Sequence, residues 1–175
     1  SSQYAERRKA IKAYNANSPI LKKGLALTPV KFGISFTASF LNQAGALIHI
    51  YTDGSIHLNH GGTEMGQGLN TKVAQVVAEV FQVDISSLQI TATNTDKVPN
   101  TSPTAASSGA DLNGKAAQNA AETLKQRLTE FAAKHYKCEE AQVEFRNGHV
   151  RVGEQVISFD TLAQQAWMGQ VSLSS

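Results

Sequence analysis

Residues 46–59, ALIHIYTDGSIHLN, carry the clearest structural pattern in this chain of 175 residues. Apolar and polar side chains alternate on both sides of the pair Asp53-Gly54, and this is the period of a strand with one buried face. Asp-Gly favours the positive φ angles of a tight turn between antiparallel strands. The stretch therefore predicts a β-hairpin, around which the other elements can be placed.

The residues that follow this hairpin predict a helix and a short strand. Glycines gather in His60–Gly68, and directly after them apolar side chains recur at helical spacing over Leu69–Gln82. The short apolar run Ser87–Thr93 predicts a strand. The stretch Asn94–Ser108 is rich in Asn, Thr, Ser and Pro, so we expect a loop there.

A second, longer helix is expected to begin at Asp111 or Asn113, since either residue type can cap a helix, and to continue to about His135. The first half of this helix is mostly alanine. Small side chains let a helix lie close to another backbone, although alanine is also the best helix former. The expected buried stripe consists of Ala117, Ala120, Leu124, Leu128 and Phe131.

The last part of the chain predicts a second hairpin and a closing helix. The hairpin covers Val143–Val152 and turns at Asn147-Gly148. Val156-Ile157 is a candidate third strand. Phe159–Met168 has helical spacing, with Ser158 in the position of its cap.

The first part of the chain predicts a peripheral helix and a strand. Tyr4–Asn15 has apolar side chains at helical spacing, and Pro19 ends any helix that begins upstream. Apolar residues are frequent over Gly24–Phe36 and alternate with polar ones after Pro29. This alternation predicts a strand that ends near Phe36.

The order of these elements predicts an α+β fold, in which antiparallel hairpins and a mixed sheet pack against helices. The loop after Lys137 is the position at which the chain could divide. The two parts would be a main unit, residues 1–137, and a small hairpin-and-helix unit, residues 138–175.

Composition excludes several classes of protein. Of the residues, 41% are hydrophobic and 17% are charged, as in a globular protein, and the net charge of +2 gives no electrostatic reason to bind nucleic acid. No apolar run is long enough to span a membrane. The single cysteine, Cys138, cannot form an internal disulfide, which favours a reducing, cytoplasmic setting.

Residues 61–68 place four glycines immediately before a helix, where free backbone N–H groups and the helix dipole favour an anion. Gln67 lies between two of the glycines, so its backbone can approach a ligand. The spacing fits neither a Walker loop, because Gln67-Gly68 replaces the Lys and Ser/Thr, nor a dinucleotide fingerprint, because Thr71 replaces the third glycine. An ordinary tight turn between hairpin and helix is the alternative.

A second run of small residues, Thr101–Asp111, also leads into a helix. Two such loops could hold opposite parts of one polar, anionic ligand through main-chain donors and hydroxyl groups. The alternative is a serine-rich linker. A zinc site at His49, His57 and His60 is a weaker hypothesis, because no fourth ligand stands at a suitable spacing.

Several long segments resemble the large, molybdenum-binding subunit of the xanthine dehydrogenase family of molybdenum hydroxylases. The resemblance covers most of residues 25–121, and relative to the family pattern Asp96-Lys97 is an insertion. It implies that residues 1–175 are a fragment of the family's molybdopterin-binding domain. The segments are FGISFT (32–37), FLNQAGAL (40–47), YTDGS (51–55), His60–Gly68 and Asn94–Ser107.

The resemblance implies a reaction in which a molybdenum-molybdopterin centre hydroxylates a purine, hypoxanthine to xanthine to urate, with oxygen from water. Electrons then leave through 2Fe-2S clusters and FAD, which are bound outside this chain. The family's catalytic glutamate belongs to a motif beyond the end of the chain. We therefore expect no catalytic residue here, and we expect the isolated fragment to be inactive.

The resemblance also assigns cofactor contacts. Gln67 looks like the glutamine that hydrogen-bonds an oxygen ligand of molybdenum, and Gly66 is similar to its loop neighbour. Ala106 looks like the alanine whose backbone meets the metal site, with Ala105 and Ser107 beside it. No residue of this chain is expected to bind the metal directly.

Two residues are similar to substrate contacts of the family. Phe36 resembles an aromatic residue that holds the purine ring, and Thr37 resembles a hydroxyl that hydrogen-bonds it. An aromatic contact with one hydrogen bond suits a planar heterocycle. The expected partners are the purine and the remaining domains or subunits of an oligomeric parent, with no nucleic acid and no membrane.

Two alternatives to purine oxidation stay open. The first is a related molybdenum hydroxylase that acts on aldehydes or other N-heterocycles, because the cofactor motifs are shared among them. The second is a non-catalytic binding or scaffold domain that keeps the fold without the cofactor.

Overall fold

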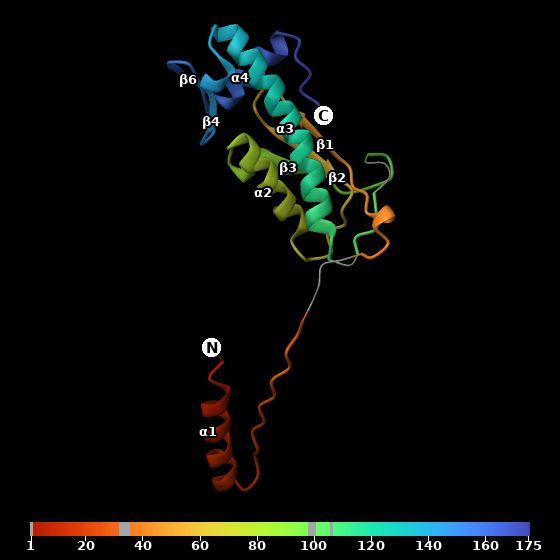
Figure 1. Ribbon diagram of the computed structural model, residues 1–175, viewed down its shortest axis with the longest axis vertical. Helices are drawn as coiled ribbons and strands as arrows, with labels where there is room; N and C mark the ends of the chain where they lie inside the picture. The colour runs from red at the N-terminus through yellow and green to blue at the C-terminus, as the bar shows by residue number, and fades with distance from the viewer. Residues whose placement is uncertain (1, 32–35, 98–100, 106) are drawn as a thin grey trace. The chain divides into compact units, whose positions relative to one another are not determined.

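The chain is described by a computed structural model that covers residues 2–31, 36–97, 101–105 and 107–175. It divides into two compact units, residues 1–33 and residues 34–175 (Figure 1). The first unit contains helix α1, Tyr4–Asn17, which has no buried residue. The predicted N-terminal helix is therefore confirmed and ends two residues later than expected.

The strand predicted over Gly24–Phe36 is wrong for residues 24–31 and for Phe36, none of which is in a strand. Residues 32–35 lie outside the described part of the chain. An alternating pattern describes only one face of a segment. A strand also needs a neighbour to bond its N–H and C=O groups, and residues 24–31 have no such ladder.

The second unit begins with a short 3-10 helix, Ser39–Leu41, and a three-stranded sheet, β1-β2-β3. β1 (Ala46–Ile50) and β2 (Ile56–His60) pair antiparallel, whereas β3 (Leu88–Ile90) pairs parallel with β2. The predicted hairpin and the strand after it are confirmed, and the sheet is mixed as expected.

The turn of this hairpin differs from the prediction. Only Gly54 has a positive φ, 80°, and its N–H donates to the carbonyl of Tyr51, whose own N–H donates to the carbonyl of Ser55. The carboxylate of Asp53 instead accepts hydrogen bonds from the Ser55 N–H and hydroxyl. These bonds lower the pKa of Asp53 and hold a five-residue loop in place of the two-residue turn.

Two helices cover the sheet. α2 (Leu69–Phe81) follows the glycine-rich loop as predicted, and a 3-10 turn, Ile85–Ser87, leads into β3. α3 extends over Gly109–Tyr136, so it begins before Asp111 and Asn113, and neither residue caps it. Of its predicted stripe, the two alanines and two leucines are buried and Phe131 is partly buried.

The second three-stranded sheet is antiparallel throughout, in the order β4-β5-β6. The turn between its first two strands has positive φ at both Asn147 (49°) and Gly148 (75°), as the sequence predicts. The elements are β4 (Val143–Arg146), β5 (His149–Val152), β6 (Gln155–Ser158) and α4 (Phe159–Met168), and a 3-10 turn, Glu140–Gln142, precedes them.

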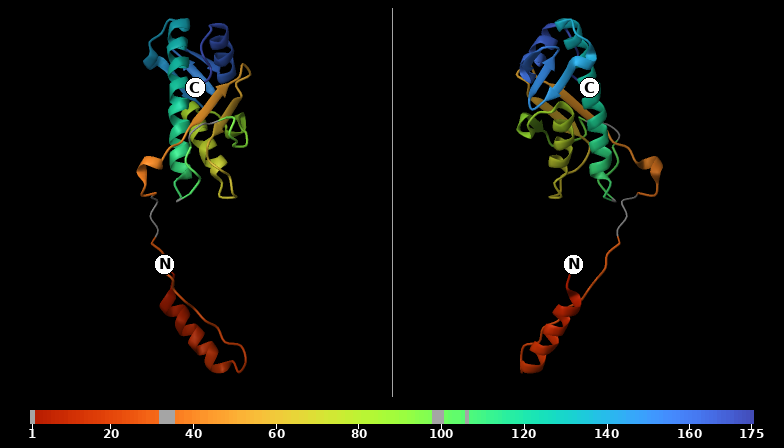
Figure 2. Two further views of the ribbon diagram at one scale, coloured as in Figure 1. Left: turned by 90° about the vertical axis from the view of Figure 1, so that its right-hand side faces the viewer. Right: turned by 60° about the vertical axis from the view of Figure 1, so that its left-hand side comes forward.

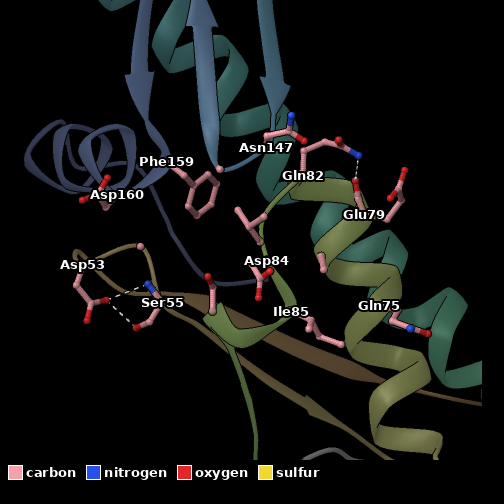
Figure 3. A pocket seen from close by; sticks show the side chains of 15 residues that line it. Asp53, Ser55, Gln75, Glu79, Gln82, Asp84, Ile85, Asn147, Phe159 and Asp160 are labelled. Carbon is pink, nitrogen blue, oxygen red and sulfur yellow. Dashed lines mark hydrogen bonds between the residues drawn. The ribbon is translucent and has the colours of Figure 1, made fainter.

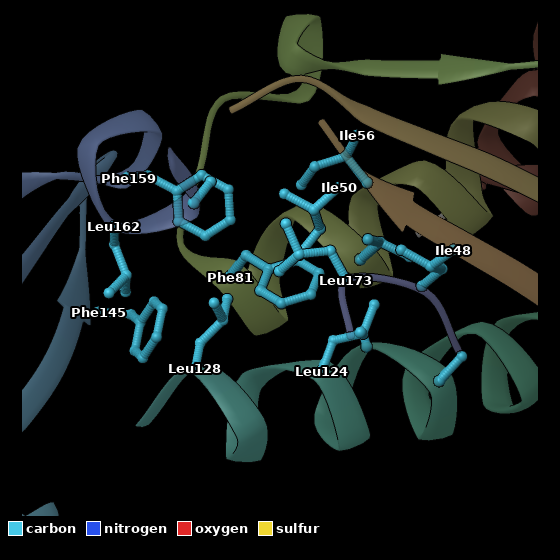
Figure 4. Close-up of a cluster of buried hydrophobic side chains, with 14 of the residues drawn as sticks. Ile48, Ile50, Ile56, Phe81, Leu124, Leu128, Phe145, Phe159, Leu162 and Leu173 are labelled. Carbon is cyan, nitrogen blue, oxygen red and sulfur yellow. The ribbon is translucent and has the colours of Figure 1, made fainter. Parts of the chain in front are cut away.

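One hydrophobic core joins both sheets to the helices (Figure 4). α3 contacts α2, α4, β1, β2, β4 and β5, and Figure 2 shows it running past both sheets. Side chains such as Ile48, Leu128, Val150 and Leu162 are fully buried together. The possible boundary near residue 137 coincides with the change of sheet, but as a division into separate units it stays a prediction.

The end of the chain adds to the first sheet. Ile48 and Ser175 exchange two backbone hydrogen bonds of 2.8 and 3.0 Å, and the N–H of Ile50 donates to Leu173. The fold is α+β, with helices packed on one mixed and one antiparallel sheet. Among the described residues, no helix is both long and apolar enough to cross a membrane.

Candidate functional site

The glycine-rich loop, residues 61–68, connects β2 to α2 and ends on two left-handed glycines. Gly66 and Gly68 have φ of 90° and 76°, and no atom lies within 4 Å of where a Cβ would be at either position. A residue with a Cβ is strained in this conformation. The loop therefore has a backbone that only glycine adopts readily, with open space beside it.

The carboxylate of Glu64 binds the backbone amides at the start of α2. Oε1 accepts hydrogen bonds from Gly66 N (2.8 Å) and Gly68 N (3.0 Å), and Oε2 accepts one from Asn70 N (2.9 Å). The bond from Asn70, followed by those from the glycines, holds the pKa of Glu64 below its usual value. The anion expected at these amides is thus the protein's own carboxylate, a role that the sequence reading missed.

Gln67 is exposed and folds back over its own loop. Its Oε1 accepts a hydrogen bond from Met65 N, and its Nε2 donates to the carbonyl of Thr63 at 2.9 Å. An amide nitrogen carries two hydrogens, and the second has no acceptor among the residues that the structure describes. The side chain is therefore held in one orientation and keeps one donor for a ligand.

The second small-residue loop packs against the first. Thr104 Oγ1 accepts a hydrogen bond of 2.7 Å from the backbone N–H of Thr63. A Cβ at Gly61 would overlap the side chain of Thr101, so only glycine lets the two loops approach so closely. The two helix entries that the sequence singled out are thus in direct contact.

The same loop also binds the segment after Phe36. The Ser102 hydroxyl accepts a hydrogen bond from Gln43 N (2.9 Å), and Ser102 N donates to the Gln43 carbonyl (2.8 Å). Asn42 donates from its amide to the carbonyl of Phe36. These bonds connect residues 36–43 to residues 101–105, more than fifty positions apart in the chain.

A cavity of about 330 Å³ lies between these two segments. Phe36 and Ala105, which the resemblance assigns to substrate and cofactor, both line it. The cavity also has apolar and amide side chains from the segment after Phe36. The remaining lining residues are Leu41, Asn42, Gln43, Thr101, Ser102, Pro103 and Ser108.

The other predicted site residues lie outside this lining. Thr37 is exposed, and Gly66 and Gln67 are on the neighbouring glycine-rich loop. Ser107 is exposed and has a positive φ of 57°, an uncommon conformation for a residue with a side chain. Ala106 lies outside the described residues.

Buried polar side chains lie beneath the glycine-rich loop. His60 Nδ1 accepts a hydrogen bond from Gly62 N at 3.1 Å, and Thr93 donates to the carbonyls of both residues. Burial lowers the pKa of His60, which keeps its ring neutral near pH 7. Its Nε2 and the Oδ1 of Asn113 are buried without a partner in the described part of the chain.

The other two histidines of the zinc hypothesis have separate partners. His49 hydrogen-bonds the Ser174 hydroxyl, and His57 hydrogen-bonds that of Thr91. Within the described residues, no group of three or more His, Cys, Asp or Glu side chains is arranged to hold a metal ion. The histidines thus take part in the hydrogen bonding of the sheet.

A larger cavity, about 1020 Å³, is formed by the hairpin turns and the C-terminal end of α2 (Figure 3). Four carboxylates line it, those of Asp53, Glu79, Asp84 and Asp160, and none of the predicted site residues does. Three of them, the aspartates, accept hydrogen bonds from neighbouring serines or threonine, which lowers their pKa values. The three aspartates therefore serve the turns themselves, and we place the candidate site at the smaller cavity, which the predicted residues Phe36 and Ala105 line.

Comparison with known protein families identifies the family to which this chain belongs. The family of molybdopterin cofactor-binding domains matches residues 1–175. The chain belongs to this family. The contact between the two small-residue loops is thus a feature of a molybdopterin cofactor-binding domain, and the cofactor class expected from the resemblance is confirmed.

Relatives of this cofactor-binding domain are parts of much longer proteins. The chain is 54% identical over 135 residues to xanthine dehydrogenase/oxidase of Mus musculus and 56% identical over 127 residues to xanthine dehydrogenase of Calliphora vicina. These matches cover 77% and 73% of the chain, but only 10% and 9% of the relatives. The chain therefore spans about a tenth of the length of these proteins.

A solved structure has the same fold. The CO dehydrogenase of Oligotropha carboxidovorans superposes with a TM-score of 0.70 and 25% identity over 77% of this chain and 18% of that one. Quinoline 2-oxidoreductase of Pseudomonas putida 86 matches with a TM-score of 0.69 and 21% identity. The α+β fold of the molybdopterin cofactor-binding domain is thus confirmed.

Proposed function

We propose that this chain is the part of a xanthine dehydrogenase-type hydroxylase that supplies loops to the molybdenum cofactor and a wall to the purine site. The observation that carries the proposal is the cavity of about 330 Å³ that Phe36 and Ala105 line together. Its volume is within the range of small-molecule sites. The identity of 54% to a xanthine dehydrogenase/oxidase supports the purine assignment.

The residues present fit a molybdenum-molybdopterin group. Gly66 and Gly68 leave open space at the loop, and Gln67 keeps one amide hydrogen for a ligand. On the second loop, Ala105 and Ser107 are exposed. The resemblance also assigns Ala106, between them, to the cofactor. When bound, the group supplies the redox chemistry by which a ring carbon is hydroxylated with oxygen from water.

The chain's own residues bind and orient in this proposal. Phe36 is 39% exposed and lines the cavity, and an aromatic ring in its wall suits a planar heterocycle. Thr37, the next residue in the chain, is exposed, and its hydroxyl is the proposed hydrogen-bond partner of the ring. The general base, the 2Fe-2S clusters and FAD belong to the rest of a cytoplasmic, oligomeric parent.

Replacing Phe36 by Ala in the full-length parent should raise KM for xanthine about 10- to 100-fold, because the ring contact and its buried apolar area are lost. Molybdenum content should stay at the wild-type level. Steady-state kinetics with an artificial electron acceptor and metal analysis of the same preparations measure the two quantities.

Phe36→Tyr is the matched control, since it keeps the aromatic face and should keep KM within a few fold of wild type. An unchanged KM in Phe36→Ala would remove the residue from the substrate site. A parent that holds molybdenum but oxidises quinoline or an aldehyde in place of xanthine would move the proposal to a related hydroxylase. A parent without molybdenum would favour a non-catalytic domain.

A further inference from the structure

Glu64 is an exposed carboxylate that none of the predicted roles uses, yet it accepts hydrogen bonds from two amides of the glycine-rich loop and from one at the start of α2. Its three bonds go to backbone amides, and two of these amides flank Gln67. We propose that Glu64 is a positioning residue that acts through the loop backbone to hold Gln67 toward the cofactor. The inference rests on the proposed function.

The geometry gives Glu64 this role because one oxygen binds both sides of Gln67. Oε1 accepts from Gly66 N at 2.8 Å and from Gly68 N at 3.0 Å, so the backbone before and after Gln67 is fixed to a single atom. Oε2 accepts from Asn70 N and fixes the same carboxylate to the first turn of α2. The position of Gln67 is thereby tied to the helix.

Residues 64–68 are held by the side chains of Glu64 and Gln67, whereas the other side-chain bonds of the loop reach only Gly62 and Thr63. Gly66 and Gly68 have no side chain of their own to pack, with open space where a Cβ would be, and glycine loses more backbone entropy on ordering than other residues. The residue before α2 is Gly68, which has no side chain to cap the helix. A carboxylate at the helix start satisfies those amides and the helix dipole together.

The Gln67 side chain depends on the same arrangement. Its two bonds, to Met65 N and to the Thr63 carbonyl, span residues 63–67, and Glu64 lies between these partners in the chain. If Gly66 and Gly68 move, Gln67 and its remaining donor hydrogen move with them. Replacing Glu64 should therefore lower kcat in the same way as replacing Gln67, but by a smaller factor.

The experiment compares Glu64→Ala, Glu64→Gln, Gln67→Ala and the double variant Glu64→Ala/Gln67→Ala in the full-length parent. Amide hydrogen exchange of residues 65–70 reports on the loop whether or not the enzyme turns over. Molybdenum content and xanthine kinetics report on the site. Asp84→Ala is the matched control, because Asp84 is also an exposed carboxylate that accepts a backbone N–H, from Ser86, but lies at a distant turn.

Glu64→Ala should speed exchange over residues 65–70 by at least about tenfold and lower kcat about tenfold, with KM and molybdenum content near wild type. Glu64→Gln keeps one acceptor oxygen for Gly66 and Gly68, so it should recover most of the activity. The double variant should be no slower than Gln67→Ala, because both changes remove one function. Asp84→Ala should change none of these quantities.

Unchanged exchange in Glu64→Ala would overturn the proposal, as would losses that multiply in the double variant. A wild-type parent without molybdenum is a different failure. It would overturn the proposed function first, and the positioning role would fall with it.

Discussion

Replacing Gln67 by Ala in the full-length parent should lower kcat for xanthine about 10- to 100-fold, the usual cost of losing an outer partner of a metal site. Gln67 is the side chain of the glycine-rich loop that has both a fixed orientation and a free donor hydrogen. Alanine keeps the backbone but removes the donor. Steady-state kinetics and molybdenum analysis of the purified parent measure the effect.

One further variant separates the donor from the shape of the side chain, and a second is a control for the residue type. Gln67→Glu keeps the length and the acceptor for Met65 N but has no amide hydrogen to offer, so it should be impaired like Gln67→Ala. Gln75→Ala changes the same residue type at an exposed position of α2 and should be neutral. Normal turnover in Gln67→Ala with normal molybdenum content would remove Gln67 from the site.

The largest effect on stability is expected at Phe81. Its side chain is 1% exposed at the end of α2, and its ring centroid lies 5.7 Å from that of Phe159 at the start of α4. Phe81→Ala should lower the free energy of unfolding by about 3–5 kcal/mol, because it leaves a cavity where the helices and sheets meet (Figure 4). Urea unfolding of the 175-residue chain measures this change.

Phe40→Ala is the control for this experiment. Phe40 is 77% exposed, so the same substitution should change the free energy of unfolding by no more than about 0.5 kcal/mol. A loss at Phe81 as small as the one at Phe40 would contradict a single core shared by α2 and α4. Because one core joins both sheets to the helices, we expect the chain to unfold in one cooperative transition, and unfolding without one would contradict this.

The hairpins and helices could be predicted because their signals are local. Asn147-Gly148 determines a turn through its own φ angles, and the helical spacing after Gly68 needs no distant information. At Asp53-Gly54 the local signal predicts the hairpin correctly but not the type of its turn. The hairpin is there, but the carboxylate of Asp53 bonds Ser55 and selects a longer loop.

The strand predicted before Phe36 shows what local patterns leave out. Alternating apolar residues describe a face that can be buried, but they do not say which segment bonds the backbone. The start of α3 is a related case. Asp111 and Asn113 can cap a helix by residue type, yet the helix begins at Gly109, and Asn113 donates to the Gly109 carbonyl from inside it.

The site could be predicted in its parts but not in its assembly. Phe36 and Ala105 are far apart in the sequence, and hydrogen bonds between Gln43 and Ser102 connect their segments in a way that no local pattern predicts. The role of Glu64 could have been predicted from the sequence, because the residue before α2 is a glycine, which has no side chain to cap the helix. A carboxylate four residues earlier is a candidate for the missing cap.

The assignment of these loops to a molybdenum cofactor can be tested directly by measuring the molybdenum and pterin content of the purified full-length parent. We expect stoichiometric molybdenum with its pterin in the wild-type protein, together with xanthine-dependent reduction of an electron acceptor. A parent that contains neither, under conditions that load a control hydroxylase, would contradict the assignment of these two loops to a molybdenum cofactor.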